Sequence, residues 1–553
     1  MTSVRPRPRR GGGRRIPAAS AVAVAFLLLW QLLIVAAPAS AHAVLESSDP
    51  VDGSRIATAP ERVTFTFDES VQLPEGATAA LSDQGTRVDA GGAHLVGSGK
   101  TVVVPLKKPI ADGAYTVSYR VVSADGHVVT GAIRFGLNAD PSTAPETAQA
   151  PLDPVQMVSE AAQGLVYGGI VLLIGVAFAG LVLWPAVGGR RGALVLRWLG
   201  WSLLTGGTLL RLLLAGPAAT GSGWGGVLRF DGIGTTLAEV GGAAGLVRLA
   251  LMLIALPWVA RPDRGGPAGR AGSALLAVAV LWSVAADGHA AAGADAWLAL
   301  PITTVHLAAM AAWVGGLLVL AGFVVPRLDG DDAGLARLRR WSVVAFAAVA
   351  LLIVTGEYQA WRQLDPLQSL TSTAYGITLL VKLGLVAVAI AAAFASNRLL
   401  VRLGPPRDTA GRRRIRTIVS AEAAVTLAAV VVTTVLVALP PARTTYGPPT
   451  TLSAPAGSGT AQIVLDSTHA GPQTITVTLE GPSGSPVRAQ GMTGTLGTTT
   501  VAGVELHFER SSTGAWVAHA IAPVAGDWTV QLSIDLGGSG RYATSAAYRV
   551  WAG

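Results

Sequence analysis

The sequence LPITTVHLAAMAAWVGGLLVLAGFVV, residues 300–325, decides the fold of this chain. It contains no Asp, Glu, Lys or Arg, and it exceeds the roughly 20 apolar residues that an α-helix needs to cross the hydrocarbon core of a bilayer. We therefore expect it to form a membrane-spanning helix. The composition agrees, because 51% of the 553 residues are hydrophobic and only 13% are charged, which is too apolar for a purely soluble protein.

Similar apolar segments recur on both sides of this one, and together they predict a bundle of about eight transmembrane helices. The segments lie near 157–185, 194–216, 240–260, 272–286, 300–325, 341–361, 375–396 and 415–439. The fourth of them is short for a span. We expect the helical region as a whole to occupy residues 154–440.

Arginines between the segments predict the orientation of the bundle. Cytoplasmic loops carry an excess of Lys and Arg, and seventeen arginines fall in alternate loops, which we assign to the inside. They are Arg190, Arg191, Arg197, Arg261, Arg264, Arg270, Arg327, Arg337, Arg339, Arg340, Arg398, Arg402, Arg407, Arg412, Arg413, Arg414 and Arg416. The other loops carry essentially Arg229 and Arg362. This asymmetry places both ends of the chain outside a bacterial cytoplasmic membrane.

Residues 1–41 are typical of a secretory signal peptide. Residues 1–15 are rich in arginine, residues 17–37 are apolar, and Ala39-Ser40-Ala41 is a small-residue cleavage site. An uncleaved signal anchor is the alternative, because the apolar part is long. The chain has no cysteine, which excludes disulfides, thiolate metal sites and a lipid-modified cysteine.

Residues 42–137 are expected to form an exported β-sandwich or barrel. Short alternating or β-branched runs, such as residues 62–67, 101–105 and 115–122, are separated by turns that contain Gly and Asp or Glu. The stretch 42–150 is acidic, with thirteen Asp and Glu against eight Lys and Arg. An acidic exported domain is a poor partner for nucleic acid and suits a cation.

Cleavage after Ala41 would give this domain an N-terminal histidine, His42. Its α-amine and its own Nδ1 can bind one metal ion and close a chelate ring, and Cu(II) favours such tetragonal nitrogen ligation. Asp125 and His127 lie two residues apart, so on an extended segment they face the same side and can bind one ion together. The alternative is an ordinary turn with incidental polar residues.

Four motifs in this domain closely resemble the CopC family of exported copper-binding proteins, and the resemblance spans the whole domain. They are HAxLxxSxPxxG at residues 42–53, Phe67-Asp68-Glu69, YRVVSADGH at residues 119–127 and GAxxFG at residues 131–136. The resemblance implies that His42, Asp125 and His127 are the Cu(II) ligands, with Glu69 as a weak ligand or as a neighbour that supports them. Some CopC proteins also have a methionine-rich Cu(I) site. This domain has no methionine, so we expect a Cu(II) site only, and we expect His94 to be a surface residue.

Polar residues inside the apolar segments are candidates for a copper pathway, because they are costly to bury in a membrane. His306 and Met310 are four residues apart and share a helix face, and imidazole with thioether suits Cu(I). His289 lies in an outer loop near the mouth of this pathway. The alternatives are that Met310 only packs against a neighbouring helix and that His306 makes an interhelical hydrogen bond.

The run from His306 to Leu317 resembles the CopD family, which is linked to copper uptake. Tyr375-Gly376 with Lys382, Asn397-Arg398, and the stretch from Arg416 to Glu422 also look like that family. The resemblance covers most of residues 155–440, and it implies import of copper.

Residues 460–553 are expected to form a second exported β-domain, a small immunoglobulin-like sandwich. Alternation at period two in residues 461–465, 473–479 and 528–534 predicts its strands. Flexible linkers, residues 138–153 and 441–459, join the two β-domains to the helices. Candidate ligands in this domain are His469, His507 and His519, although their spacing matches no metal motif and surface or core roles are the alternative.

Together these features predict a multi-pass membrane protein that handles copper and is not an enzyme. It would bind Cu(II) outside the cytoplasmic membrane and pass copper to helices that import it, with an exported copper chaperone or reductase as a further partner. One alternative is an exported copper buffer or sensor whose helices do not transport. A minor alternative is a copper oxygenase with an N-terminal histidine, but Asp125 would occupy a position that oxygen needs.

Overall fold

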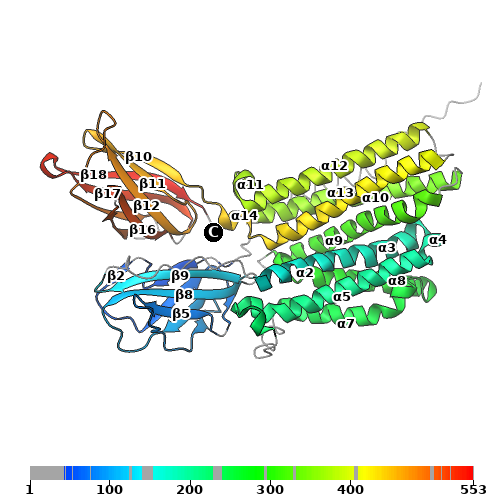
Figure 1. The fold of residues 1–553 in the computed structure, drawn as a ribbon, viewed down its shortest axis with the longest axis horizontal. Helices are drawn as coiled ribbons and strands as arrows, with labels where there is room; N and C mark the ends of the chain where they lie inside the picture. Colours follow the sequence, from blue (N-terminus) through cyan, green and yellow to red (C-terminus); the bar gives the residue numbers. More distant parts are fainter. Residues whose placement is uncertain are drawn as a thin grey trace, which may run out of the picture. The chain divides into compact units, whose positions relative to one another are not determined.

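A computed structural model of the chain describes most residues from Ala43 onward. The described residues are 43, 45–52, 54–74, 76–123, 128–139, 154–227, 240–291, 295–327, 332–403, 409–498, 503–511, 513–522 and 525–551. They form an N-terminal β-domain, a series of long helices and a C-terminal pair of sheets (Figure 1). The predicted signal peptide, residues 1–41, lies outside the described residues.

The N-terminal β-domain consists of two sheets that share one core. One sheet has the order β1 (Leu45–Asp49), β3 (Arg62–Phe67), β7 (Thr101–Pro105) and β6 (His94–Val96). The other has the order β2 (Ser54–Ile56), β9 (Val128–Leu137), β8 (Gly113–Ser123) and β4 (Val71–Gln72), and β5 (Thr78–Ser82) also pairs with β8. This two-sheet arrangement is the β-sandwich that the alternating runs predict.

Alternation of buried and partly exposed residues explains how β3 faces this core. Val63, Phe65 and Phe67 are fully buried, whereas the threonines between them are partly exposed. The ring of Tyr119 on β8 packs against Phe65 and Phe67, with centroids 4.7 and 5.3 Å apart. Gly131 on β9 stands opposite Tyr119, and a Cβ at Gly131 would overlap the tyrosine hydroxyl. A glycine is therefore required at the position where the GAxxFG motif begins.

Eight helical segments in the described chain are long and apolar enough to cross a membrane, in agreement with the eight predicted segments. They are α2 (Pro154–Ile170) with its continuation η2 (Val171–Gly175), α3 (Val176–Phe178) and η3 (Ala179–Leu183); α5 (Arg191–Thr220); α7 (Val240–Ala260); α8 (Gly266–Ala285); α9 (Ala296–Val319) with η6 (Leu320–Val324) and η7 (Val325–Arg327); α10 (Asp332–Gln363); α12 (Ala374–Leu403); and α13 (Thr409–Ala438). The fourth span is longer than its predicted core of 272–286, because Gly266-Pro267 begins the helix earlier.

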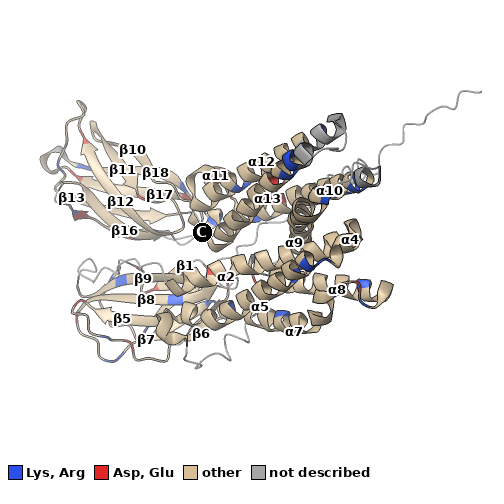
Figure 2. Ribbon diagram, turned by 45° about the vertical axis from the view of Figure 1, so that its right-hand side comes forward, with Lys and Arg blue, Asp and Glu red and all other residues tan. Residues whose placement is uncertain are grey.

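Shorter helical elements connect these spans. They are α4 (Pro185–Gly188), η4 (Gly223–Gly226), η5 (His289–Ala291), α11 (Ser369–Ser372) and α14 (Ala442–Thr445). Basic residues gather near ends of α8, α10 and α12, while the middle parts of the spans carry few charges (Figure 2). The positive-inside rule predicts membrane orientation from this kind of distribution of basic residues.

Glycines set the closest approach between α9 and the first span. A Cβ at Gly175 would overlap the carbonyl oxygen of Ala311, and a Cβ at Gly315 would lie 2.5 Å from the Cα of Gly175. Small residues of this kind let membrane helices touch backbone to backbone. The span that includes α9 is the most buried of the eight, so it forms the centre of the bundle.

The C-terminal strands form two antiparallel sheets with a common core, as the predicted sandwich requires. One sheet has the order β10 (Thr450–Ala456), β11 (Gly459–Leu465), β12 (Gly471–Glu480), β16 (Trp516–Ala522) and β15 (Glu509–Arg510). The other has the order β14 (Val504–His507), β13 (Gly491–Gly497), β17 (Gly526–Asp535) and β18 (Arg541–Val550), and η8 (Gly537–Ser539) joins its last two strands. Trp528 is fully buried between the sheets.

Candidate metal centre

Only one of the four residues predicted for the Cu(II) site of the N-terminal β-domain is described. His42, Asp125 and His127 lie outside the described residues, whereas Glu69 is described and half-buried. Ala43, Ser123 and Val128, which lie close to these three residues in the chain, are described, and their contacts show how the domain brings the separate motifs together.

A chain of two hydrogen bonds connects three motifs that are far apart in the sequence. The backbone N–H of Ala43 donates to Oγ of Ser123 over 3.2 Å, and the Ser123 hydroxyl donates to Oε1 of Glu69 over 2.5 Å. Ala43 directly follows His42, and Ser123 stands two residues before Asp125. Ala43, the Phe67-Asp68-Glu69 motif and the end of β8 therefore meet at one place.

Strand pairing explains this meeting. Ser123 is the last residue of β8 and pairs with Val71 at the start of β4, which follows Glu69 closely in the chain. Val122 pairs with Val128, the first residue of β9, so the two ends of the 124–127 segment are held together.

Tyr119 is the tyrosine closest in sequence to this region, and its hydroxyl does not provide an anionic ligand. Tyr119 lies four residues before Ser123 and is 7% exposed. Burial raises the pKa of its hydroxyl, and the negative charge of Asp52 adds to this shift, so the phenol stays neutral. Its role in the structure is the ring packing against Phe65 and Phe67 described above.

The second candidate region surrounds His306 in the centre of the bundle. Nδ1 of His306 lies 2.8 Å from Oγ1 of Thr355 on α10, and that hydroxyl donates to the carbonyl of Leu351 over 2.5 Å. Because Thr355 has one proton and gives it to Leu351, we infer that the threonine oxygen accepts from His306 and that Nδ1 carries the proton. Nε2 of the neutral imidazole then keeps its lone pair, which is the form that binds a metal ion.

Room beside this ring comes from a glycine on the same helix as Thr355. A Cβ at Gly356 would lie 3.4 Å from Cε1 of His306, the ring atom between the two nitrogens. The hydrogen bond to Thr355 is the interhelical bond that the sequence left open as an alternative for His306. It does not use Nε2, so a structural and a metal-binding role are compatible.

Met310 has a different environment from His306, although both lie on α9. It is buried in an apolar cluster that includes Tyr167 from α2, Met252 from α7 and Leu281 from α8. The packing role that the sequence allowed for Met310 is therefore present. His289 begins η5, and its side chain lies outside the described set.

The histidines of the C-terminal sheets have separate surroundings. Nε2 of His469 lies 2.5 Å from the carbonyl of Thr444, and burial lowers the pKa of this ring. His507 on β14 and His519 on β16 are exposed, as is His94 in the N-terminal domain. Within the described part of the chain, no group of three or more His, Cys, Asp or Glu side chains is placed to hold a metal ion.

Two buried ion-pair clusters near helix ends were not predicted from the sequence. Asp287 accepts hydrogen bonds from Arg211 over 2.6 Å and from Arg248 over 3.1 Å. Arg211 also donates to the side-chain oxygen of Gln163. Both arginines bind Asp287, because a fully buried guanidinium such as that of Arg248 needs a counter-ion.

The second cluster corrects the placement of Arg362 in an outer loop. Arg362 lies in the last turn of α10, is 5% exposed and donates to Oδ1 of Asp295 over 2.9 Å. The other oxygen of this carboxylate accepts from the hydroxyl of Tyr358 over 2.7 Å. The predicted segment ended at residue 361 because the apolar pattern ends there, whereas the helix continues to pair its charge.

Comparisons with known proteins match two parts of the chain to copper-related families. The family model described as "CopC domain" matches residues 45–138, and that described as "Copper resistance protein D" matches residues 335–436. Copper transport protein CutJ of Bacillus subtilis is 27% identical over 376 residues, which cover 65% of this chain and 68% of that protein. Copper resistance protein C of Pseudomonas syringae pv. tomato is 34% identical over 113 residues, which cover 19% of this chain and 86% of that protein.

Two solved structures are also similar to part of the chain. The crystal structure of CopC from Methylosinus trichosporium OB3b is 24% identical, with a TM-score of 0.16, and the match covers 20% of this chain and all of that chain (100%). The methionine-rich copper resistance protein PcoC from Escherichia coli is 30% identical with a TM-score of 0.16, covering 18% of this chain and 99% of that chain.

Proposed function

Since this chain belongs to the CopC family and carries a copper resistance protein D domain in the same polypeptide, we propose that it binds Cu(II) outside the cytoplasmic membrane and passes copper to its own helices for import. The observation that carries this proposal is the hydrogen-bonded chain from Ala43 through Ser123 to Glu69. It brings together the residue directly after His42, the residue two positions before Asp125, and Glu69 itself.

In the proposed Cu(II) site, the α-amine and Nδ1 of His42 close a chelate ring, and Asp125 and His127 complete the plane. Glu69 supports the site as a weak fourth partner or through its hydrogen bond with Ser123. The Ala43 N–H bond to Ser123 aids this arrangement, because it fixes the residue directly after the proposed chelate.

In the proposed membrane step, copper travels as Cu(I) past His306. Reduction of Cu(II) needs one electron, which we assign to an exported reductase or to a chaperone that delivers reduced copper. The lone pair on Nε2 of His306 is the first proposed ligand in the bundle, with Met310 as a second, softer ligand after a side-chain rearrangement. His289 would lie at the outer entrance. The name of the relative CutJ, a copper transport protein, supports transport in preference to storage.

The orientation that we propose puts both β-domains outside the cytoplasmic membrane. Its support is the distribution of arginines, seventeen of which lie in loops or near helix ends on one side of the predicted topology. In this orientation the acidic β-domain faces the source of the metal, and the helices cross the barrier behind it.

The decisive experiment inserts one glycine between Ala41 and His42 in the full-length protein. If the enzyme that removes the signal peptide still cuts after Ala41, which mass spectrometry of the intact chain would verify, the amine of His42 becomes an amide. We expect the affinity for Cu(II) to fall roughly 100-fold or more, where each tenfold corresponds to about 1.4 kcal/mol. The His94→Ala variant is the control, because His94 is exposed on β6 and should leave the affinity unchanged.

Competition titration and electron paramagnetic resonance would measure this effect. The resonance spectrum detects Cu(II) alone, so a Cu(I) site in the membrane does not contribute to it. An unchanged affinity and an unchanged number of coupled nitrogens in the glycine variant would falsify the N-terminal chelate.

A further inference from the structure

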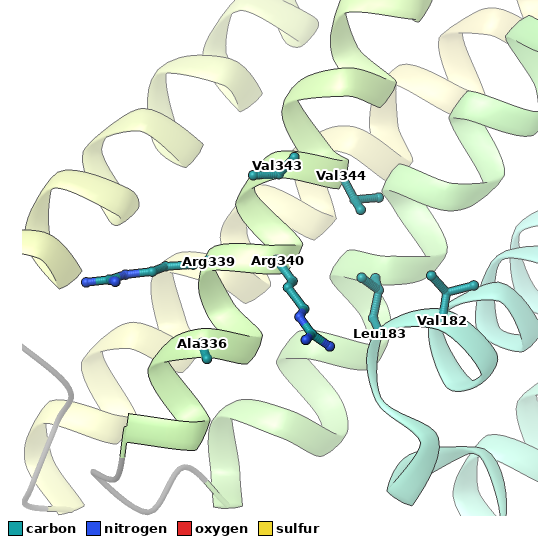
Figure 3. A pocket seen from close by; sticks show the side chains of 7 residues that line it. All are labelled: Val182, Leu183, Ala336, Arg339, Arg340, Val343 and Val344. Atoms are coloured by element: carbon teal, nitrogen blue, oxygen red, sulfur yellow. The ribbon is translucent and has the colours of Figure 1, made fainter. Parts of the chain in front are cut away.

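A pocket of about 810 Å³ opens between α10 and the end of the first span. Figure 3 shows the side chains that line it. They are Val182, Leu183, Ala336, Arg339, Arg340, Val343 and Val344. The pocket combines apolar walls with two arginines, and it lies at the arginine-rich N-terminal end of α10, in a region that the copper proposal does not use.

Bulky packing behind the pocket gives it a fixed wall. The first span ends in the π-helical turn η3, and Pro185 then starts a new helix. The ring of Trp184 packs against that of Trp341 on α10 with centroids 5.7 Å apart, and both rings are buried. Because the tryptophans join the two helices directly beside Leu183, the pocket is a built feature of the bundle.

The exposed part of the pocket has the character of a lipid contact. Val182 is 55% exposed and Val343 is 69% exposed. A valine that forms the outer surface of a spanning helix faces acyl chains, since the hydrocarbon core is the apolar solvent of such a helix. One wall of the pocket therefore continues the surface that contacts lipid tails.

The two arginines supply the charge at the other end. Both are exposed, and neither has a carboxylate partner among the residues for which the structure gives contacts. In Figure 3 Arg340 extends on the side of α10 that faces Val182 and Leu183, whereas Arg339 extends away from them. Guanidinium groups bind phosphate through paired N–H donors, so Arg340 is placed to bind it directly and Arg339 to add positive charge nearby.

We propose that this pocket binds one anionic phospholipid, with the phosphate at Arg340 and an acyl chain along Val182 and Val343. A ligand that fits the whole pocket needs an apolar part for the valines and a negative charge for the arginines. Free phosphate lacks the apolar part, and a neutral lipid lacks the negative charge. Basic pockets between helices at the membrane boundary are known sites for such headgroups. The inference needs the helices to span a membrane, but it does not depend on copper binding.

The test uses the full-length protein in nanodiscs of phosphatidylcholine with a minor fraction of phosphatidylglycerol. Native mass spectrometry after release into detergent counts the phosphatidylglycerol that stays bound. The double variant Arg339→Gln with Arg340→Gln should retain it roughly fivefold less per arginine removed. The matched control is Arg413→Gln with Arg414→Gln, which removes two exposed arginines near the start of α13 and none from the pocket.

A second variant separates shape from charge. Val343→Trp keeps both arginines but fills the pocket, and we expect it to release the bound lipid as well. An excess of inorganic phosphate should not displace the lipid from the unmodified protein. Equal loss in the pocket and control pairs would show a diffuse charge effect and overturn the proposal, as would full retention in Val343→Trp or displacement by phosphate.

Discussion

At the scale of single residues, Ser123 makes both of the hydrogen bonds that hold the described part of the proposed metal site together. Its hydroxyl accepts from the N–H of Ala43 and donates to Glu69, so one oxygen links the residue after His42 to the acidic motif. Such supporting hydrogen bonds orient the groups that bind a metal, and their loss weakens binding although no ligand is removed.

Replacing Ser123 by alanine should therefore lower the Cu(II) affinity roughly 10–100-fold. The buried N–H of Ala43 would also lose its partner, which destabilises the domain by about 1–3 kcal/mol. Titration of Cu(II) and thermal unfolding of the same protein would measure both effects. Ser118→Ala is the control, because Ser118 lies on the same strand and donates to Ala79 outside the site. Equal affinities for the two variants would remove Ser123 from the site.

His306 is the residue on which the transport proposal depends. His306→Ala should reduce copper accumulation by cells while the Cu(II) affinity of the protein stays the same. Thr355→Val keeps the shape but removes the acceptor of the Nδ1 proton, so it should reduce accumulation less. The control is Thr304→Val, since Thr304 is also buried and donates only to its own helix, at Leu300. Normal accumulation in His306→Ala, at normal protein levels, would favour a buffer or sensor in place of a transporter.

The sequence predicts these residues as candidates for the site, but it does not predict their contacts. His42, Asp125 and His127 are proposed from residue type, spacing and a family resemblance, and they remain predictions. Ser123 stands inside the quoted YRVVSADGH motif, yet its partners lie 80 and 54 residues away in the chain. No periodicity along one strand reveals a contact of that range, because it depends on how β1, β3 and β8 fold against one another.

At the scale of elements, the eight spans agree with the sequence, but their ends and contacts do not follow from it. An apolar pattern locates the buried middle of a helix, and it stops where charges begin. Arg362 was placed in a loop for this reason, although Asp295 lets α10 carry it in its last turn. Likewise, the sequence places Asp287 in a loop, whereas in the structure it forms ion pairs with two arginines from other helices.

The crossing of the first span with α9 gives a test at this scale. Gly175→Ala places a methyl group against the carbonyl of Ala311, and overpacking of this kind costs about 1–3 kcal/mol. Gly322→Ala is the matched control within the same long span as Ala311, because nothing lies within 4 Å of its added Cβ. Thermal unfolding in detergent should show a lower midpoint for Gly175→Ala alone. Equal midpoints would mean that the two helices do not touch at this glycine.

At the scale of the whole molecule, the orientation of the chain in the membrane is the property to test. Protease added to intact spheroplasts should remove the β-domains at residues 42–150 and 460–553, because the arginine distribution places both outside. Antibodies against each domain would follow their loss, and a cytoplasmic protein would report that the cells stayed closed. Protection of either β-domain would contradict the proposed topology.

The hydrogen bond between Ala43 and Ser123 holds the residue next to His42 at the proposed site, so signal-peptide removal determines when that site is complete. On the proposed ligand set, the amine of His42 exists only after the leader has been removed, so a newly made chain inside the cell lacks this ligand. Each molecule would reach full affinity once, at the moment of processing, and on the far side of the membrane. Immature copies would therefore compete only weakly for the copper of the cell's own cuproenzymes.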